Sequence, residues 1–296
     1  IEAELNADKK RPNDDMQEVK NYIIALEYGI DQIKDRPLSL RLIKEMHEKL
    51  MFGARGAYAR PGHFRTVQNW IGTPGSSLNL AKYVPPSPDH VLECLTVLES
   101  FLHDKAVSPL VHIALCHYQF EAIHPFIDGN GRIGRLLITL LLIEKEILTT
   151  PLLYLSAFFE ATRNEYYQQL YNVSAKGSWN EWLVYFLNGV ITQSESVLSC
   201  INQMRIIEKA WKMRVVKMST NIEIIIENLL SNPYVTVNSV SKILNVAFTT
   251  AQRVVNALEQ VQIITQISDN KRGRLYCAKE ILSLLNEPVV VNYYEK

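Results

Sequence analysis

The sequence has few cysteines, and none of them are spaced as a metal site would require. The four cysteines among its 296 residues lie 22 or more residues apart: Cys94, Cys116, Cys200 and Cys277. A structural zinc site needs closely spaced pairs, and a disulfide framework needs a cysteine-dense chain, so we expect neither. Thiols scattered among apolar stretches are typical of a reducing compartment, and we expect the protein in the cytoplasm.

Long apolar runs and an excess of one charge are also lacking. No uncharged apolar run approaches about 18 residues, and no charged segment followed by an apolar one opens the chain, so we expect neither a membrane span nor a signal peptide. The chain begins at Ile1 rather than at Met, and we expect it to be part of a longer protein. Lys and Arg number 31 against 31 Asp and Glu, so the overall charge attracts neither nucleic acid nor an anionic membrane.

Glycine and proline are scarce, with 12 of each, and 47% of the residues are hydrophobic. This composition is typical of a folded chain rather than a disordered or collagen-like one. At roughly 100–200 residues per domain, the length predicts two domains. We place the boundary where the pattern of the sequence changes, which gives domains at residues 1–218 and 219–296.

Apolar residues recur at helical spacing through most of the first domain, so we predict a mainly α-helical bundle. Ser39 and Pro88 are start signals for two of its helices. Between these two helices, aromatic and β-branched residues broken by glycines predict a small β-hairpin, or flap, over residues 62–72. The expected helices cover residues 19–33, 42–50, 91–102, 109–123, 131–147, 156–173 and 180–217.

The second domain reads as three short helices followed by a hairpin, over residues 222–229, 240–244, 251–258 and 263–277. That order is typical of a winged helix-turn-helix domain. From Thr220 onward, 7 basic residues are balanced by 7 acidic ones, and nucleic-acid affinity comes largely from neutralised phosphates. We therefore expect an interaction or dimerisation module. DNA binding through residues 249–260 and 271–274 remains the alternative.

The stretch His124–Arg135, HPFIDGNGRIGR, lies between two predicted helices and has three features suited to a polyphosphate. Gly129 and Gly131 can adopt positive φ, which lets backbone N–H groups converge on an anion. The following helix directs its N-terminal N–H groups and its dipole at the same place. Arg132 and Arg135 lie on neighbouring positions of the first turn, where they can bind phosphate oxygens.

Two further side chains of this stretch are of the types that bind a metal ion and remove a proton. Asp128 is a hard oxygen ligand of the kind that binds the Mg²⁺ accompanying a nucleotide. His124, with an unperturbed pKa of ~6.5, can be a neutral base at cellular pH. Together they predict transfer of a phosphorus-containing group to an acceptor whose proton His124 removes. The plainer alternative is a helix-to-helix loop with capping glycines and surface arginines.

The stretch resembles the Fic family signature HxFx(D/E)GNGRxxR in every specified position. The resemblance covers roughly residues 15–290 and includes the segments Gly62–Arg65, Asn69–Gly72, Tyr83–Pro86, Tyr154–Ser156 and Arg163–Tyr167. It implies a Fic-type helical bundle whose enzymes move AMP from ATP onto a Ser, Thr or Tyr hydroxyl of a protein.

The same resemblance implies roles for individual residues. His124 would be the catalytic base, and Asp128 would hold Mg²⁺ on the phosphates of ATP. Tyr167 would border the adenine, and the target protein would dock on the flap near Trp70–Gly72 by strand addition. The nucleotide would be bound by Gly129, Asn130, Gly131, Arg132, Ile133, Gly134 and Arg135.

Many proteins of that family carry a regulatory glutamate in a (S/T)xxxE(G/N) helix, paired with the second arginine of the signature. Glu2 is the candidate here, although Ala3 stands where the family has Gly or Asn; Glu27 lacks both flanking features. We hypothesise that Glu2 pairs with Arg135 and holds the enzyme in a low-activity state.

Three function classes stay open: an AMP-transferring enzyme, a DNA-binding regulator with a nucleotide-binding domain, and a nucleotide-binding module of a complex. Intact His124 and Asp128 favour the enzyme, because a module that only held nucleotide has no need of the base. Removal of AMP from a target, the reverse reaction, is a further alternative. A homodimer is compatible with the sequence.

Overall fold

The structure, a computed structural model, describes residues 12–53, 59–72, 78–216, 218–270 and 273–287. It divides into two compact units, one ending at Gln193 and one beginning at Ser194. The division falls inside the long helix α9 (Trp179–Arg214), whereas the predicted boundary between residues 218 and 219 lies beyond that helix and stays a prediction. No helix within the described ranges is long and apolar enough to cross a membrane.

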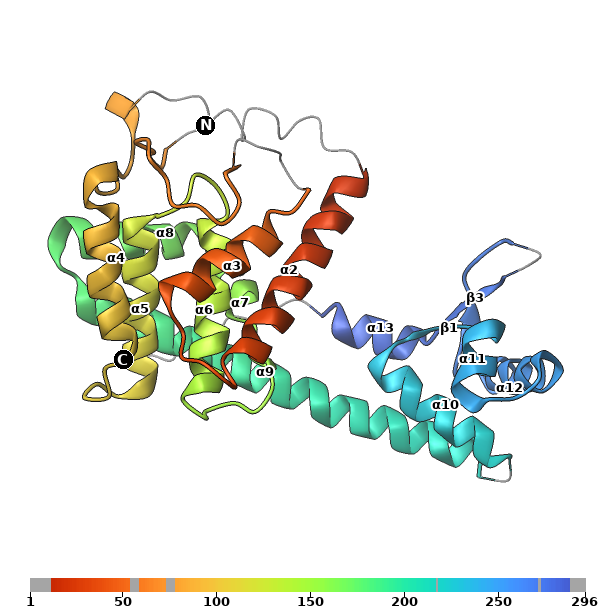
Figure 1. The fold of residues 1–296 in the computed structure, drawn as a ribbon. Helices are drawn as coiled ribbons and strands as arrows, with labels where there is room; N and C mark the ends of the chain where they lie inside the picture. The colour runs from red at the N-terminus through yellow and green to blue at the C-terminus, as the bar shows by residue number, and fades with distance from the viewer. Residues whose placement is uncertain (1–11, 54–58, 73–77, 217, 271–272, 288–296) are drawn as a thin grey trace. The chain divides into compact units, whose positions relative to one another are not determined.

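The first unit is a bundle of helices with one core (Figure 1). Its helices are α2 (Pro12–Gln32), α3 (Leu40–Leu50), α4 (Pro88–Leu102), α5 (Pro109–Ile123), α6 (Asn130–Glu144), α7 (Leu155–Ala161), α8 (Arg163–Lys176) and the first part of α9. Helix α5 packs between α4 and α6, and α3 packs on α2. Phe120, Phe126 and Trp182 are fully buried between them. The predicted mainly helical fold is confirmed.

The predicted start signals act as expected. The Ser39 hydroxyl accepts a hydrogen bond from the Leu42 N–H, 3.4 Å away, and caps α3. Pro88 and Pro109 occupy the first turns of α4 and α5, where a missing N–H costs nothing. Helix α6 begins at Asn130, directly after Gly129, whose φ is +83°.

The first expected helix, over residues 19–33, begins earlier, at Pro12, and another predicted helix is interrupted. The segment expected as a single helix over residues 156–173 is two helices, α7 and α8, separated at Thr162. The Thr162 hydroxyl donates to the Phe158 carbonyl at 2.8 Å and lies 2.7 Å from the Tyr185 hydroxyl. A threonine that bonds back to the preceding turn bends or ends a helix, and periodicity alone does not reveal it.

The flap is less regular than a hairpin. Among the described residues of the flap and of the segment that follows it, there are one antiparallel bridge, between Ile71 and Tyr83, and the short 3-10 helix η3 (Leu78–Leu80). The Ile71 N–H donates to the Tyr83 carbonyl at 2.9 Å, and the Tyr83 N–H returns a bond of 3.1 Å. Side-chain hydrogen bonds, described below, hold the rest of the segment.

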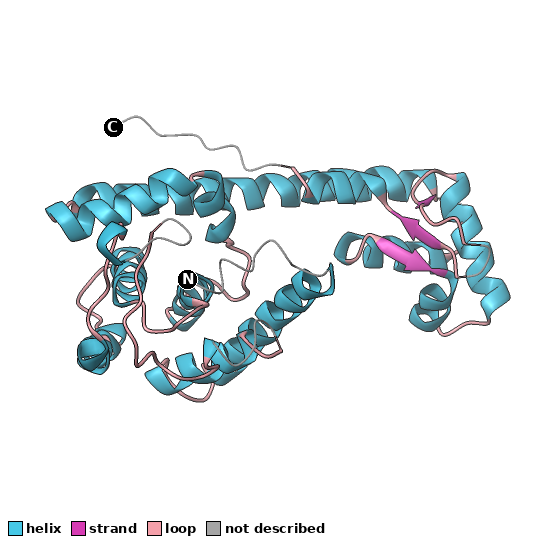
Figure 2. Cartoon of the chain, turned by 90° about the horizontal axis from the view of Figure 1, so that it is seen from above, coloured by secondary structure: helices cyan, strands magenta, loops and turns pink. Residues whose placement is uncertain are grey.

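The second unit comprises the end of α9, α10 (Thr220–Ser231), β1 (Tyr234–Thr236), α11 (Val237–Leu244), α12 (Phe248–Gln260), β2 (Thr265–Gln266), β3 (Leu275–Cys277) and α13 (Lys279–Leu285). The strands form an antiparallel sheet of order β1-β3-β2, drawn in magenta in Figure 2. Three helices followed by paired strands are present, as predicted. Strand β1 and helix α13 are not anticipated by the sequence, because each is too short to show a period.

Candidate active site

His124 ends helix α5 in the left-handed conformation, with φ 49° and ψ 60°. Its ring Nδ1 lies 3.3 Å from the Glu121 carbonyl oxygen, which can only accept, so Nδ1 carries the proton of the neutral ring. Nε2 is then the basic nitrogen, and it has no hydrogen-bond partner among the described residues. Burial lowers the pKa of His124 to about 4, so the ring is neutral at pH 7.

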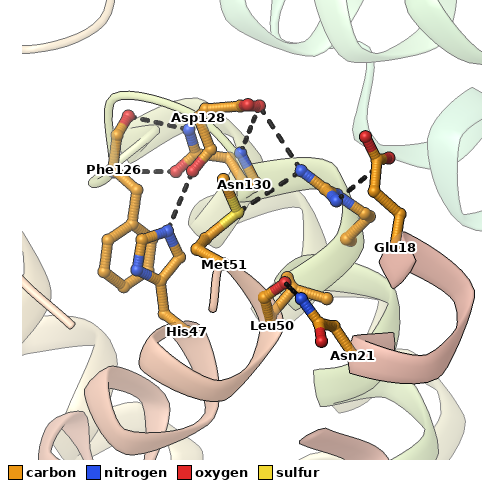
Figure 3. A network of polar contacts seen from close by, with 10 residues as sticks. Glu18, Asn21, His47, Leu50, Met51, Phe126, Asp128 and Asn130 are labelled. Carbon is orange, nitrogen blue, oxygen red and sulfur yellow. Dashed lines mark hydrogen bonds and ion pairs between the residues drawn. The ribbon is translucent and has the colours of Figure 1, made fainter. Parts of the chain in front are cut away.

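The loop after His124 is fastened by the amide of Asn130. Its Oδ1 accepts from the Phe126 N–H at 2.8 Å, and its Nδ2 donates to the Phe126 carbonyl at 2.8 Å (Figure 3). Asn69 donates to the same carbonyl at 3.1 Å. The predicted nucleotide contact of Asn130 therefore rests on its backbone N–H, because the side chain is buried and engaged with the loop.

Asp128 stands at the centre of the loop with a half-buried carboxylate. Its Oδ1 accepts from the Gly129 N–H at 2.6 Å and lies 3.7 Å from Nη2 of Arg132. Its backbone carbonyl oxygen lies 3.0 Å from Nε2 of His47, which is labelled beside it in Figure 3. A Cβ at Gly129 would approach the Met51 sulfur to 3.1 Å, so this turn requires glycine for space as well as for its positive φ.

The two arginines of the motif reach different surroundings. Arg132 Nη1 lies 3.5 Å from the Glu18 carboxylate on α2, and its Nη2 lies 3.4 Å from the Met51 sulfur. Arg135 instead lines a cavity of about 380 Å³. The other residues lining this cavity are Tyr154, Ser156, Ala157, Phe159, Glu160, Arg163, Tyr166 and Tyr167. The structure thus brings Arg135 and Tyr167, two predicted nucleotide contacts, to one cavity.

Next to this cavity lies a cluster of buried polar side chains that was not predicted from the sequence. The Tyr166 hydroxyl is 2.9 Å from His117 Nε2, and His117 Nδ1 is 3.1 Å from the Gly134 carbonyl. Because that carbonyl only accepts, His117 donates to it and accepts from Tyr166, and burial lowers the pKa of His117 to about 3. The one available signal is the spacing of His117, Glu121 and His124, which places them on one face of α5.

Glu121 is the acidic member of this group. Its Oε1 is buried without a hydrogen-bond partner in the described part of the chain. Burial raises the pKa of Glu121 to about 7, against an opposing effect of the Arg135 charge. A Cβ at Gly134 would overlap the Glu121 carboxyl, and the Ile133 side chain is fully buried in the core. These contacts give Gly134 and Ile133 a packing role beside their predicted nucleotide contacts.

Arg65 fastens the base of the flap to the candidate site. Its Nε donates to the His124 carbonyl at 2.9 Å, and its Nη2 donates to the carbonyls of Ile123, at 3.3 Å, and Pro86. The Arg65 N–H donates to the Pro125 carbonyl at 2.8 Å. Arg65 belongs to the segment Gly62–Arg65 that resembles the Fic family, and the sequence alone indicates no role for it.

Two predicted elements lie outside the described residues. Glu2 lies outside the described residues, so its pairing with Arg135 stays a hypothesis. Residues 271 and 272 of the predicted wing also lie outside them.

Comparison with known proteins identifies the segment that carries this site. Residues 37–142 match the model of a family described as Fic/DOC. The chain is 34% identical over 137 residues to the protein adenylyltransferase fic-1 of Caenorhabditis briggsae, and 32% identical over 137 residues to that of Caenorhabditis elegans. Each match covers 45% of this chain and 24% of the relative, so the chain spans about a quarter of the length of these curated relatives.

The fold is also similar to that of solved structures. The crystal structure of a Fic family protein from Desulfovibrio desulfuricans superposes with a TM-score of 0.57 at 21% identity, covering 91% of this chain and 76% of that one. A second, of a Fic domain containing signaling protein from Bacteroides thetaiotaomicron, gives a TM-score of 0.51 at 21% identity, over 64% of this chain and 72% of that one. At this identity the likeness establishes the fold. Together with the matched segment, it shows that the chain contains a Fic/DOC domain.

Proposed function

We propose that this chain, from its Fic/DOC domain at residues 37–142, is a protein adenylyltransferase that moves AMP from ATP to a hydroxyl of a target protein. The observation that carries the proposal is a neutral His124 whose Nε2 has no partner among the described residues, in the loop that leads into α6. Similarity to relatives named protein adenylyltransferases supports the same reaction.

In the proposed reaction, His124 Nε2 removes the proton of the acceptor hydroxyl. The acceptor oxygen forms a bond to the α-phosphorus while the bond from that phosphorus to the bridging oxygen of pyrophosphate breaks. The N–H groups of the first turn of α6 have no intrahelical acceptor, and we assign them to the phosphate oxygens. Arg132 and Arg135 hold the outer phosphates, and Tyr167, which lines the same cavity as Arg135, borders the adenine.

The residues present fit a nucleotide-bound Mg²⁺. Such an ion takes one or two carboxylates and completes its shell with phosphate oxygens and water. Asp128 supplies a half-buried carboxylate next to the first turn of α6, and the described residues place no group of three or more His, Cys, Asp or Glu to hold a metal by themselves. When bound, the ion would offset the phosphate charge.

Three further parts of the proposal concern partners and control. The target docks on the flap near Trp70–Gly72 by strand addition, on the side away from Tyr83, because the bridge to Tyr83 already uses the N–H and the carbonyl of Ile71. Glu2 pairs with Arg135 in a resting state. The second unit is a winged-helix module for interaction or dimerisation, in keeping with its order of helices and strands and with its balanced charge.

The test is to incubate the protein with ATP that carries a label on either the α-phosphate or the γ-phosphate. The control is the same incubation with the His124→Asn variant. Asparagine also tolerates the left-handed conformation of residue 124, so the variant removes the base with little effect on the turn. We expect label from the α-phosphate only, reduced by about 10²–10⁴-fold in the variant. Label from the γ-phosphate would instead indicate a kinase, and no label at all a binding module.

A further inference from the structure

His47, on α3, joins two segments that are far apart in the sequence. Its side chain is fully buried. The Gly62 N–H donates to Nδ1 at 2.9 Å, and Nε2 lies 3.0 Å from the Asp128 carbonyl oxygen. Because a backbone N–H can only donate, Nδ1 must be the accepting nitrogen and Nε2 must carry the proton. His47 therefore donates to Asp128, and only one tautomer of its neutral ring satisfies both bonds.

The surroundings of the ring keep it in this orientation and in this charge state. It stacks on the Phe126 ring, with centroids 3.7 Å apart and planes 6° from parallel. A Cβ at Gly129 would lie 3.3 Å from Nε2, so the ring rests directly against the loop. Burial lowers the pKa of His47 to about 4, which leaves the neutral tautomer populated at pH 7.

The bond to Asp128 matters because of the residue that follows. Gly129 has a φ of +83° and no side chain. The plane of the peptide between residues 128 and 129 can therefore turn easily about the backbone bonds on either side of it. The loop is fastened on one side by Asn130 at Phe126 and on the other by helix α6. The carbonyl of the peptide between residues 128 and 129 accepts from His47, and its N–H donates to Asp128 Oδ1, so the His47 bond holds the peptide plane from the side opposite the carboxylate bond.

We propose that His47 is a positioning residue, which orients the Asp128 carboxylate toward the nucleotide-bound divalent ion by holding the Asp128 carbonyl. The inference rests on the proposed function, since that function assigns the ion to Asp128. Hydrogen-bonding partners of metal ligands commonly alter metal affinity by 10–100-fold when they are lost. His47 would be such a partner acting through the main chain.

Two substitutions separate the bonds of the ring. In His47→Asn, the amide Oδ1 can occupy the place of Nδ1, which keeps the Gly62 bond and loses the donor to Asp128. In His47→Gln, the amide Nε2 can occupy the place of the ring Nε2, which keeps the donor and loses the Gly62 bond. Both variants lose the stacked ring, so their cost to folding is matched and is checked by thermal unfolding.

The measurement is Mn²⁺ binding, followed by electron paramagnetic resonance, in the presence of an ATP analogue with a methylene bridge between its α- and β-phosphorus atoms. We expect Mn²⁺ affinity to fall about ten-fold or more in His47→Asn and to stay within about three-fold of wild type in His47→Gln. Asp128→Ala is the reference for a lost ligand. Equal Mn²⁺ affinities in the two His47 variants would overturn the proposal.

A second readout needs no ligand. Hydrogen exchange of the Gly129 amide, which lies in the peptide that His47 holds, should be faster in His47→Asn than in His47→Gln. Equal exchange rates would also overturn the proposal. Wild-type protein that binds no Mn²⁺ with the analogue would refute the metal role of Asp128 and with it the proposed function, while the exchange comparison would still decide whether His47 anchors the loop.

Discussion

The Arg65 guanidinium, which is 2% exposed, donates from Nε to the carbonyl oxygen of His124 at a distance of 2.9 Å. This cation sits at the C-terminal end of α5, where the helix dipole favours positive charge. Its described partners are carbonyl oxygens, which offset part of the cost of burying the charge. Burial still lowers the pKa of Arg65 below its ordinary value. One side chain thus connects the flap to the residue proposed as the base.

We expect Arg65→Lys to destabilise the protein by about 2 kcal/mol or more, because an ammonium group cannot reach the several carbonyls that the planar guanidinium bridges. AMP transfer should fall as well, because the His124 carbonyl loses a hydrogen bond. Urea unfolding measures the first effect, and transfer of α-phosphate label measures the second. Arg60→Lys is the matched control: that exposed arginine bonds the Thr66 hydroxyl, and its replacement should change stability by less than about 0.5 kcal/mol. Equal effects at the two positions would contradict the role of Arg65.

Glu121 should make stability depend on pH between about 4.5 and 7. Its pKa is raised from the ordinary 4.5 to about 7 in the folded protein, so in this interval the folded state holds a proton that the unfolded state has released. The contribution of this group to stability therefore falls as pH rises, by up to about 3 kcal/mol. Glu121→Gln should abolish that contribution, so that the variant is more stable than wild type at pH 8 and similar to it at pH 4.

Thermal unfolding of both proteins across this pH range gives the measurement. The control is Glu160→Gln, which changes an exposed carboxylate lining the same cavity. That variant should follow the pH dependence of wild type. A Glu121→Gln protein that retained the full wild-type slope between pH 5 and 7 would show that this carboxyl is not the buried acid.

Much of the framework was predictable because its signals are local. Ser39 and Pro88 mark helix starts through the chemistry of a single turn, and the apolar stripes follow a fixed period. The candidate site was predictable for the same reason, since the loop at residues 124–135 is contiguous. Its residues are neighbours in the sequence, so the motif can be found without knowing the rest of the fold.

The side chains that hydrogen-bond to the backbone of that loop could not be predicted, because they come from distant segments of the chain. Arg65 and His124 are 59 residues apart, and His47 and Asp128 are 81 apart. A sequence shows Arg65 as one of many basic residues and His47 as one polar residue within a helix, and no period links them to a particular carbonyl. Glu121 is similar: its raised pKa, and the lack of a hydrogen-bond partner for its Oε1 within the described part of the chain, depend on how α6 packs against α5.

The ion pair between Glu18 and Arg132 predicts an effect on nucleotide binding. Both side chains are 19% exposed. The Glu18 carboxylate is paired with Arg132, which the proposed function assigns to the phosphates of ATP, so the carboxylate competes with phosphate for this arginine. Glu18→Gln should therefore tighten ATP binding about two- to five-fold, in line with the energy of a partly exposed ion pair. Isothermal titration calorimetry measures the change. Glu27→Gln, which alters an exposed carboxylate on the same helix, should leave the ATP affinity unchanged. Weaker ATP binding in Glu18→Gln would refute the competition.

Gly131 and Gly134 lie in the same turn of α6, yet alanine should act differently at the two positions. At Gly131 a Cβ would meet Nη1 of Arg135 at 3.0 Å, and that flexible side chain can move away. Stability should therefore be unchanged, or increase by up to about 1 kcal/mol from the better helix propensity, while ATP affinity falls because Arg135 is displaced.

At Gly134 a Cβ would overlap the carboxyl of Glu121 and approach the His117 ring to 3.3 Å, and both groups are buried. Gly134→Ala should therefore destabilise the protein by about 1–3 kcal/mol, despite the gain in helix propensity. Urea unfolding and ATP titration of the two variants provide the comparison. The double variant Gly134→Ala/Glu121→Ala should recover part of the lost stability, because the shorter side chain makes room for the new methyl group. If Gly134→Ala were as stable as wild type, the packing of the buried carboxyl beneath α6 would be wrong.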